Sequence, residues 1–521
     1  MTPTEQQQHC IIKATLEKIL KMEACAGAGK TSTLNLIATA LPEQSLYMAF
    51  NKVTALEATG KFPKYVECRT THSLAHEVYG RALQHKLKRP TGKYVNVAGT
   101  GSEIAKYYKL RSVESEVATV TTANAIGLYV RKTVERFEQS ADFELEIKHM
   151  PKFDMEKAIA ADPSIVSYVF TMAKRLWKDR IDSGSVVLAT HDTYLKLFQL
   201  SKPNLPYNII YLDEAQDTTP CVLDIFMRQA GHAKLILVGD RRQAIYAWRG
   251  ATNAMASVHC ESAPLSKSFR YGNGIAEVAT KVLHNDMIIS GRDDLDSIIG
   301  LGVVDRTKPH MCLFRTNSLL LTEAVSALDR GEKIKIEIDV RDFVKLLESA
   351  QALHADDMRN VKHEMMLPYP SWYSFLAEVK EINGGELPRV AKIVDSGSAS
   401  HIIAVLHSYI APEDAIATYT TAHKAKGREA DQVVLADDFG SNYKKGEWIG
   451  MPEHDENLLY VAVTRAQRVL QINTTVAEIL DKHGVQYIIS MQDGEAEYNA
   501  VARQYDVLSE LGITEDSPPW N

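Results

Sequence analysis

Short apolar runs alternate along this chain with longer segments of helical periodicity. The runs at 45–50 (SLYMAF), 209–212 (IIYL), 235–238 (LILV) and 310–314 (HMCLF) have the length of buried strands. The segment TLNLIATAL, directly after a loop of small residues, has the spacing of a helix. Strands that alternate with helices predict an α/β fold with parallel sheets, whose functional residues lie at the carboxyl ends of the strands.

Three further segments are helical in pattern. The chain opens with a helix that we expect to run from about residue 4 to residue 20. Its predicted apolar face comprises Ile11, Ile12, Leu16 and Ile19. The segment from about 80 to 180 carries basic clusters with aromatic residues at 85–94 and 106–111, and the segment from about 326 to 411 is also mainly helical. We interpret these last two segments as insertions into two α/β lobes.

The predicted organisation is therefore two α/β lobes with parallel sheets, each carrying a mainly helical insertion. A chain of 521 residues has room for roughly three or four domains. We expect lobe 1A at 1–80 and 181–262, insertion 1B at 81–180, lobe 2A at 263–325 and 412–485, a short insertion 2B at 326–411, and a C-terminal extension and tail at 486–521. The final residues, ITEDSPPWN, are predicted to be disordered.

Composition narrows the class of protein. The hydrophobic content of 45% and the charged content of 24% are ordinary for a globular protein. The formal net charge of −7 excludes a protein that is basic all over but leaves room for a local basic channel. The six cysteines are scattered and form no C-x-x-C motif, which argues against zinc or iron–sulfur sites and for a reducing compartment. No signal peptide or membrane span is evident, so we expect a cytoplasmic protein, nucleoid-associated if bacterial or phage.

A phosphate-binding loop precedes the helix TLNLIATAL. Ala24-x4-Gly29-Lys30-Thr31 has the spacing of a P-loop, with Ala in place of the first Gly. The predicted nucleotide-binding stretch comprises Ala24, Cys25, Ala26, Gly27, Ala28, Gly29, Lys30, Thr31 and Ser32. Small residues let backbone N–H groups wrap phosphates at a helix N-terminus. Lys30 would reach the β- and γ-phosphates of ATP and Thr31 would bind Mg²⁺; the alternative is a plain turn before a helix.

Two carboxylates follow the strand at 209–212. Asp213 at a strand end can hold Mg²⁺, usually through water, and the adjacent Glu214 can polarise an attacking water. A helix N-cap is the alternative interpretation of this pair. Together with the P-loop upstream, the pair indicates ATP hydrolysis at a site that includes Lys30.

The stretch VGDRRQAIYAWRGA places a polar residue and two aromatic residues just beyond the strand at 235–238. We expect this strand to lie beside the strand that carries Asp213, so that the amide of Gln243 can reach a γ-phosphate. Tyr246 and Trp248 follow within five positions. Their rings either pack at the edge of the core or stack on the bases of a nucleic acid.

The order of these motifs resembles that of superfamily 1A DNA helicases of the UvrD/Rep type, and within them the motor of the F-box DNA helicases. The resemblance extends from about residue 4 to about residue 470. It implies two RecA-like lobes, ATP and Mg²⁺ bound between the lobes, and movement 3′→5′ on single-stranded DNA. It also implies that the protein acts as a monomer and that its partners are single-stranded DNA and single/double-strand junctions.

The resemblance also implies roles for residues outside the P-loop. Gln7 would contact adenine, although Gln6 or Gln8 could hold that register. Phe269 would stack on adenine, while Arg270 and the arginine finger Arg465 would meet the γ-phosphate. The motif V residues Gly427 and Glu429 are assigned to the nucleotide. The residues assigned to DNA are Phe50, Asn51, Thr71, His72, Tyr246, Trp248, Arg249 and His423.

Three alternatives to a helicase stay open at this point. The first is a translocase that strips proteins or recombinase filaments from single-stranded DNA with little unwinding. The others are a nucleic-acid-binding scaffold without ATPase activity and a P-loop ATPase that acts on protein. The acidic tail DSPPWN could dock a single-strand-binding protein or simply be disordered.

Overall fold

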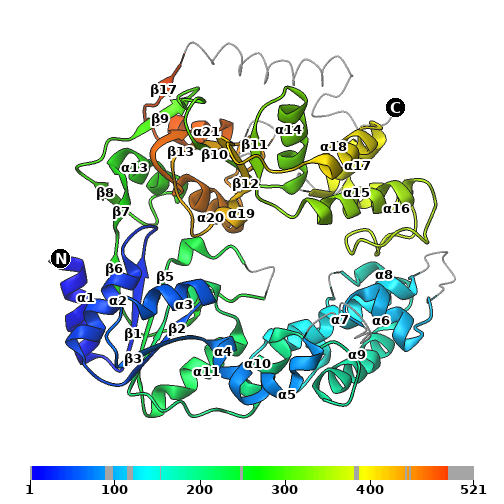
Figure 1. Cartoon of the computed structure of the whole chain (residues 1–521), viewed down its shortest axis with the longest axis horizontal. Helices are drawn as coiled ribbons and strands as arrows, with labels where there is room; N and C mark the ends of the chain where they lie inside the picture. The colour runs from blue at the N-terminus through cyan, green and yellow to red at the C-terminus, as the bar shows by residue number, and fades with distance from the viewer. Residues whose placement is uncertain are drawn as a thin grey trace. The chain divides into compact units, whose positions relative to one another are not determined.

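The computed structural model divides the chain into two compact units (Figure 1). The structure describes residues 3–87, 98–113, 121–152, 154–246, 250–380, 386–440, 443–444 and 447–490. Unit 1 comprises Met1–Leu265, Arg341–Asn383 and Leu387–Ala404. Unit 2 comprises Ser266–Val340, Gly384–Glu386 and Val405–Asn521. The tail DSPPWN, part of the basic cluster at 85–94, Trp248 and Arg249 lie outside the described residues.

Unit 1 is built on a six-stranded parallel sheet. Its strands are β1 (Ile19–Ala24), β2 (Ser45–Ala49), β3 (Val66–Thr70), β4 (Ile209–Leu212), β5 (Lys234–Gly239) and β6 (Glu261–Leu265). The order across the sheet is β3-β2-β4-β5-β1-β6. Strand β5 pairs with β4 and β1, which confirms that the strand before Gln243 lies beside the strand before Asp213. The loops after β1, β4 and β5 therefore meet at one edge of the sheet.

The helices around this sheet begin where the sequence places caps. They are α1 (Glu5–Leu16), α2 (Lys30–Ala40), α3 (Lys52–Thr59), α4 (Thr71–Ala75), α10 (His191–Leu200) and α11 (Pro220–Met227). Asn51 caps α3 by accepting the Thr54 N–H at 2.9 Å, and Thr70 caps α4 by accepting the Ser73 N–H at 3.1 Å. Asn51, which was predicted to contact DNA, thus also caps α3. Thr70 ends β3 and caps α4, whose first residues are the predicted DNA residues Thr71 and His72.

The opening helix differs from its prediction in length and in its buried face. It ends at Leu16, and Ile19 and Leu20 belong to β1 instead. The buried residues of α1 are Gln7, Cys10 and Ala14, whereas Ile12 is 59% and Leu16 72% exposed. The run of apolar residues therefore contained the end of a helix and the start of a strand, which periodicity alone does not separate.

The described residues of the segment at 81–180 fold mainly as helices. The principal ones are α6 (Gly101–Tyr108), α7 (Ala123–Gln139), α8 (Glu156–Ala161) and α9 (Ile165–Ile181), which gather at one end of unit 1 (Figure 1). They enclose a separate apolar core that includes Ile126, Val130 and Leu176. Helices α6 and α7 touch through Gly101 and Gly127, because a Cβ on Gly127 would lie 2.1 Å from the Gly101 carbonyl oxygen.

Most of the segment at 326–411 is helical and belongs to unit 1. It contains α15 (Val340–His354), α16 (Trp372–Val379), α17 (Glu386–Asp395) and α18 (Ala399–Ser408). Two ion pairs join it to the helices of the first insertion: Arg131 to Glu364 at 2.5 Å and Lys157 to Glu378 at 3.0 Å. A strand at Ile334–Ile336, β11, was not predicted, and it joins the sheet of unit 2.

Unit 2 contains a seven-stranded parallel sheet. Its strands are β9 (Ile298–Leu301), β10 (His310–Phe314), β11, β12 (Ala417–Thr421), β13 (Ala430–Leu435), β16 (Ala466–Gln471) and β17 (Ile488–Ile489), in the order β11-β12-β10-β13-β16-β9-β17. The accompanying helices include α13 (Asn273–Val282), α14 (Asn317–Asp329), α19 (Ala422–Ala425), α20 (Glu453–Val463) and α21 (Thr474–Lys482). A separate strand, β7 (Lys267–Gly272), carries Phe269 and Arg270, which were assigned to adenine and the γ-phosphate. The two parallel sheets confirm the predicted α/β class and are consistent with two RecA-like lobes.

The structure shows the state of the cysteines and the length and apolarity of the helices. All six cysteines are free. Within the described part of the chain, no helix has the length and apolarity needed to cross a membrane.

Candidate nucleotide and nucleic-acid sites

The P-loop lies between β1 and α2 at the carboxyl edge of the six-stranded sheet. Gly27 and Gly29 have φ values of +76° and +74°, the left-handed region that favours glycine. The N–H of Cys25 donates to the Leu265 carbonyl at 2.9 Å, and the N–H of Ala28 donates to the Cys25 carbonyl at 3.2 Å. These two hydrogen bonds fix the loop at the start of α2. The unpaired N–H groups at a helix N-terminus can bind an anion such as phosphate.

The side chains after the P-loop meet the two carboxylates after β4. The Lys30 Nζ donates to a carboxylate oxygen of Glu214 at 2.8 Å, and the Thr31 hydroxyl lies 3.4 Å from Asp213. Burial lowers the pKa of Lys30, but Glu214, Asp213 and Asp240 outweigh it and hold that pKa above its usual value. The structure thus brings Lys30 and Thr31 into contact with the two carboxylates at one edge of the sheet of unit 1.

Asp213 is well suited to a cation. Burial and the neighbouring Glu214 raise its pKa above the usual range, against the opposing charge of Lys30. Tyr47 on β2 donates its hydroxyl proton to the same carboxylate, and the Glu214 N–H donates to its other oxygen at 2.9 Å. A buried carboxylate beside a second carboxylate and a threonine hydroxyl offers the oxygen ligands that Mg²⁺ prefers.

Glu214 is connected to the loop that carries Gln243. Glu214 adopts a left-handed conformation with φ +50°, and Gln216 Nε2 donates to its carboxylate at 2.5 Å. The other amide atom of Gln216, Oε1, accepts the Asp240 N–H at 3.1 Å. Asp240 in turn accepts Gln243 Nε2 at 2.8 Å. Hydrogen bonds therefore run from Glu214 to the predicted γ-phosphate sensor.

Gln7 is positioned by α1 and α2 together. Its Oε1 accepts the Thr4 N–H at 3.0 Å, which completes a capping box, and its Nε2 donates to the Thr33 hydroxyl at 3.2 Å. The side chain is buried beside the first turns of the P-loop helix. These two contacts use one N–H of Nε2 and one lone pair of Oε1, and an amide group has a second of each.

The predicted DNA residues Phe50 and Tyr246 meet at the carboxyl edge of the same sheet. Phe50, which is 47% exposed, and Tyr246 have ring centroids 6.3 Å apart and planes only 10° from parallel. Tyr246 is half-buried, so it is not wholly packed into the core. Asn51 beside Phe50 is the N-cap of α3. Trp248 and Arg249, which follow Tyr246, lie outside the described residues.

The predicted DNA residues Thr71 and His72 lie at the start of α4. Thr71 is buried, and the half-buried His72 carries its Nε2 3.2 Å from a carboxylate oxygen of Asp192. Asp192 belongs to α10, far from His72 in sequence. The structure thus supplies a partner for His72 that the sequence did not suggest.

The predicted nucleotide residues Arg270, Glu429 and Arg465 lie close together within unit 2. Arg270 donates from Nε to Glu429 at 2.6 Å and from Nη1 to the Thr464 carbonyl at 2.9 Å. Arg465 is almost fully buried and donates to the carbonyls of Val461 at 2.8 Å and Arg428 at 3.0 Å. These two hydrogen bonds use two of the five N–H groups that a guanidinium offers.

The remaining predicted residues of unit 2 lie near this cluster or near α19. Phe269 is 43% exposed, which leaves its ring accessible for stacking. Gly427 has φ +86° in the loop after α19. His423 is half-buried, with its ring 6.5 Å from that of His454.

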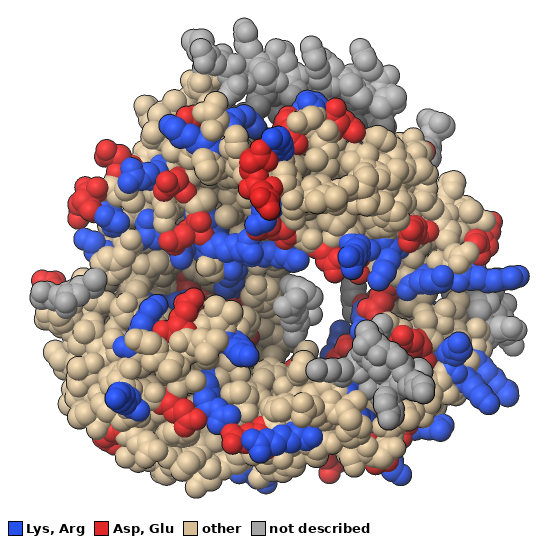
Figure 2. Space-filling view, viewed as in Figure 1, with Lys and Arg blue, Asp and Glu red and all other residues tan. Residues whose placement is uncertain are grey.

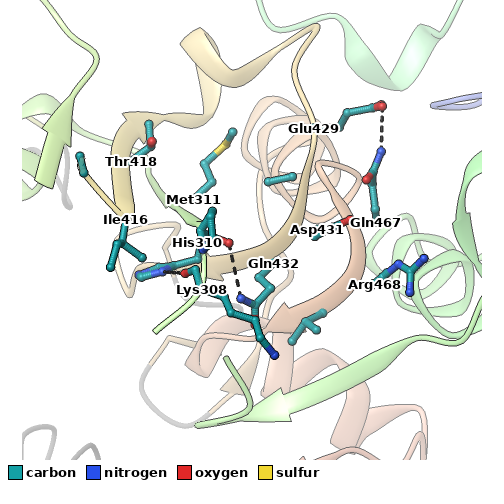
Figure 3. A pocket seen from close by; sticks show the side chains of 14 residues that line it. Lys308, His310, Met311, Ile416, Thr418, Glu429, Asp431, Gln432, Gln467 and Arg468 are labelled. Atoms are coloured by element: carbon teal, nitrogen blue, oxygen red, sulfur yellow. Dashed lines mark hydrogen bonds between the residues drawn. The ribbon is translucent and has the colours of Figure 1, made fainter. Parts of the chain in front are cut away.

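A hollow of about 610 Å³ opens at the amino ends of β10, β12, β13 and β16 (Figure 3). Met311 and Ile416 contribute apolar surface, and Lys308 and Arg468 contribute charge. Glu429 also lines it and accepts a hydrogen bond from Gln467 at 2.8 Å, which Figure 3 shows. The hollow therefore adjoins the Arg270 cluster and contains no P-loop residue.

Charge on the surface is mixed. On the face in Figure 2, Lys and Arg side chains are interspersed with Asp and Glu over both units. This distribution agrees with the slightly acidic net charge. The chemistry of the sites thus depends on local groups and not on a uniformly basic surface.

Comparison with known proteins agrees with this arrangement. The UvrD/REP helicase N-terminal domain matches residues 4–259, and the UvrD-like helicase C-terminal domain matches residues 417–472. Together the two matches cover more than half of the chain. The chain belongs to the UvrD/REP helicase family. The P-loop, the Asp213–Glu214 pair and Gln243 all fall within the first match, and Glu429 and Arg465 fall within the second.

Two curated relatives have longer chains. The chain is 30% identical to F-box DNA helicase 1 of Gallus gallus over 546 residues, which cover 96% of this chain and 51% of the relative. It is 28% identical to F-box DNA helicase protein 1 of Schizosaccharomyces pombe over 527 residues, which cover 91% of this chain and 58% of the relative. The chain thus spans a little over half the length of these relatives.

Three residues of the candidate nucleotide site were assigned no role from the sequence. Tyr47 lies within an apolar strand, where a buried hydroxyl needs a partner, and this signal was available. Asp240 follows β5 directly, so it is a strand-end carboxylate like Asp213. Gln216 lies within the run DEAQD at 213–217, but the sequence assigned it no role, because that role depends on the distance between two loops.

Proposed function

We propose that this protein is an ATP- and Mg²⁺-dependent DNA helicase that translocates 3′→5′ on single-stranded DNA, acting as a monomer at single/double-strand junctions. Membership of the UvrD/REP helicase family supports ATP use and DNA binding. The direction of movement and the use of Mg²⁺ rest on the resemblance of the motifs and on the oxygen ligands around Asp213.

The observation that carries the proposal is the connection between the nucleotide residues and the aromatic pair. Lys30 and Glu214 pair at the P-loop, and Gln216 joins Glu214 to the Asp240–Gln243 loop. That loop continues to Tyr246, which faces Phe50. A hydrolytic site and a base-stacking surface therefore share one short segment, as an ATP-driven translocase requires.

Each residue has a defined task in this proposal. Lys30 neutralises the β- and γ-phosphates, and Glu214 orients the attacking water and accepts its proton. Mg²⁺, held by Thr31 and Asp213, would spread the charge of the phosphates during transfer. We assign Arg270 and Arg465 to the γ-phosphate, Gln7 and Phe269 to adenine, and Gly427 and Glu429 to the nucleotide.

The DNA contacts are assigned in the same way. Aromatic planes stack on bases of any identity, which suits a motor that moves along every sequence. We propose that Phe50, Tyr246 and Trp248 stack on bases. The residues proposed to contact the backbone are Asn51, Thr71, His72, Arg249 and His423.

The deciding experiment measures ATP hydrolysis with and without single-stranded DNA, and then unwinding of duplexes with a 3′ or a 5′ tail. We expect DNA-stimulated hydrolysis and unwinding from the 3′ tail only. Glu214→Gln should lower hydrolysis by about 10²–10³-fold while ATP binding persists, and Lys30→Ala should lower it similarly. Removal of Mg²⁺ by chelation should stop hydrolysis.

Other results would favour the alternatives. Hydrolysis and 3′→5′ movement without strand separation would favour a translocase that clears proteins from single-stranded DNA. Hydrolysis without stimulation by DNA would indicate an ATPase that acts on protein. Absence of hydrolysis would indicate a binding scaffold.

A further inference from the structure

His72 and Asp192 come from different helices and form a close pair in unit 1. The ring atom Nε2 of His72 on α4 lies 3.2 Å from Oδ1 of Asp192 in the first turn of α10. The side chains are 41% and 34% exposed, so the pair lies at the surface where a ligand can reach it. The sequence separation is 120 residues.

The ring of His72 is held at a second place. The ring of Tyr194, two residues beyond Asp192, meets it edge to face, with centroids 6.2 Å apart and an interplanar angle of 87°. The hydrogen bond to a carboxylate places a proton on Nε2. Nδ1 makes no hydrogen bond within the part of the chain that the structure describes. The ring of His72 is therefore held in place by Asp192 and Tyr194. Its Nε2 is bonded to Asp192, and its Nδ1 can bind a ligand.

The carboxylate of Asp192 is itself fixed. Its other oxygen, Oδ2, accepts a hydrogen bond from Gln139 Nε2 at 3.3 Å. Gln139 is the last residue of α7, and its amide packs against Gly250, where a Cβ would lie 2.2 Å from the Gln139 Oε1. Gln139, which donates to Asp192, therefore contacts Gly250, and Gly250 follows the predicted phosphate sensor Gln243 in the sequence.

Asp192 is not needed as the cap of its helix. Thr190 is the N-cap of α10 and accepts the Thr193 N–H at 3.2 Å. Burial raises the pKa of Asp192, but the hydrogen bonds and charge of its neighbours, His72 first among them, hold that pKa below its usual value. The carboxylate is therefore ionised at neutral pH.

We propose that Asp192 is a positioning residue that orients His72 so that its Nδ1–H donates to a phosphate of single-stranded DNA. This inference rests on the proposed function, since it takes His72 to be a DNA contact. A neutral imidazole with its proton on Nε2 presents a lone pair at Nδ1, which repels phosphate. A histidine ring that bridges two anions donates from both nitrogens, here from Nε2 to Asp192 and from Nδ1 to the phosphate. Asp192 therefore acts on DNA only through His72.

The test compares His72→Ala, Asp192→Asn and the double variant by the salt dependence of single-stranded DNA binding. Each phosphate contact contributes about 0.7 to the slope of log K against log salt for single strands. We expect His72→Ala to weaken binding about tenfold and to reduce the slope by roughly one contact. Asp192→Asn should change both in the same direction, by about threefold to tenfold in affinity.

The double variant separates positioning from a structural effect. It should bind DNA no more weakly than His72→Ala alone, because Asp192 has nothing to orient once the imidazole is gone. Asp342→Asn is the matched control: Asp342 also lies beside a histidine, 3.6 Å from His363 Nε2, but belongs to no predicted site. It should leave affinity and slope unchanged.

The possible failures are distinguishable. If His72→Ala leaves the affinity and the slope unchanged, the assignment of His72 to DNA is wrong. If His72→Ala changes them but Asp192→Asn does not, or if Asp192→Asn has its full effect in the His72→Ala background, Asp192 does not act through His72. A fall in the melting temperature of Asp192→Asn with an unchanged slope would also overturn the inference.

Discussion

The rings of Phe50 and Tyr246 face one another almost in parallel, with their centroids 6.3 Å apart. Stacked bases are spaced by roughly 3.4 Å, so two rings that hold one base between them need about twice that distance. The separation is close to this value. Tyr246 follows Gln243 by three positions. A shift of the loop that carries Gln243 would therefore change how Phe50 and Tyr246 contact a base between them.

The first prediction concerns Phe50. Stacking on one base contributes about 1–3 kcal/mol, which corresponds to roughly fivefold to a hundredfold in affinity. Phe50→Ala should therefore raise the concentration of single-stranded DNA that half-saturates ATP hydrolysis by such a factor. Hydrolysis without DNA should be unchanged, because Phe50 makes no contact with the P-loop in the proposed site. Titration of ATPase activity with oligonucleotides measures both quantities.

Phe143→Ala is the matched control for Phe50→Ala. Phe143 is 40% exposed, close to the 47% of Phe50, but belongs to no predicted site. It should leave the DNA titration unchanged. Equal effects of the two substitutions would indicate a general loss of surface packing and would contradict the stacking role.

The second prediction concerns Gln216, which bridges Glu214 and the Asp240 N–H. Gln216→Ala should lower DNA-stimulated hydrolysis about tenfold to a hundredfold, because Glu214 loses a donor and the sensor loop loses an acceptor. Binding of single-stranded DNA without nucleotide should persist. Gln243→Ala should produce the same pattern, since Gln243 lies at the other end of the same hydrogen-bonded path.

The double variant Gln216→Ala/Gln243→Ala tests whether the path acts as a unit. Residues in one network show coupled effects, so the double variant should lose little more activity than the more affected single variant. Strictly multiplicative losses would show that the two glutamines act independently and that the bridge through Asp240 carries no coupling.

The sheets and most strands of this fold could be predicted from sequence because their apolar runs are short and end in distinctive residues. β4 and β10 have the predicted bounds, and β2 ends one residue before its prediction. The join between α1 and β1 could not be placed, since ILKMEA continues the apolar spacing of the helix. β11 was hidden for a different reason: a three-residue strand leaves almost no periodic signal.

The candidate sites were predicted where residue type and strand end coincide. Lys30, Thr31, Asp213 and Glu214 follow from the requirements of phosphate and Mg²⁺ chemistry, and the fold places them together. Asp192 could not be found in this way. Its role depends on α10 packing beside α4, a contact between segments 120 residues apart that no local pattern encodes.

The third prediction concerns the buried ion pair of Glu138 and Arg180. Their side chains are only 0% and 2% exposed, and the 2.8 Å contact is accompanied by a 2.6 Å hydrogen bond from Thr193 to Glu138. Burial raises the pKa of Glu138, and Arg180 opposes this effect. Glu138→Gln leaves a buried guanidinium without its charge partner, so the free energy of unfolding of unit 1 should fall by about 3–5 kcal/mol. Chemical denaturation followed by circular dichroism measures the loss.

Lys13→Ala is the control for burial. Lys13 and Glu261 are also 2.8 Å apart, but their side chains are 27% and 56% exposed. Water screens such a pair, so the substitution should leave stability almost unchanged. A loss as large as that of Glu138→Gln would mean that distance, and not burial, determines the contribution of these pairs.

The fourth prediction concerns pH and the Asp455–Arg315 pair in unit 2. Arg315 donates to Asp455 from Nε at 3.0 Å and from Nη2 at 2.8 Å. Burial raises the pKa of Asp455, but His454 and Arg315 together hold it below its ordinary value of 3.8. An acid with a lowered pKa contributes its full stabilisation above the unfolded-state pKa and loses it as the pH falls through the folded-state pKa.

Asp455→Asn should therefore be less stable than the wild type at pH 7, by about 1–2 kcal/mol, with a difference that shrinks below about pH 4 and disappears in stronger acid. Denaturation at a series of pH values measures this difference. Asp414→Asn serves as the control, because Asp414 and its partner Lys333 are both 65% exposed and should contribute little at any pH. If the Asp455→Asn difference stayed constant down to strong acid, the stabilisation would come from the shape of the side chain. Its disappearance in acid would assign the stabilisation to the ionised carboxylate held by Arg315.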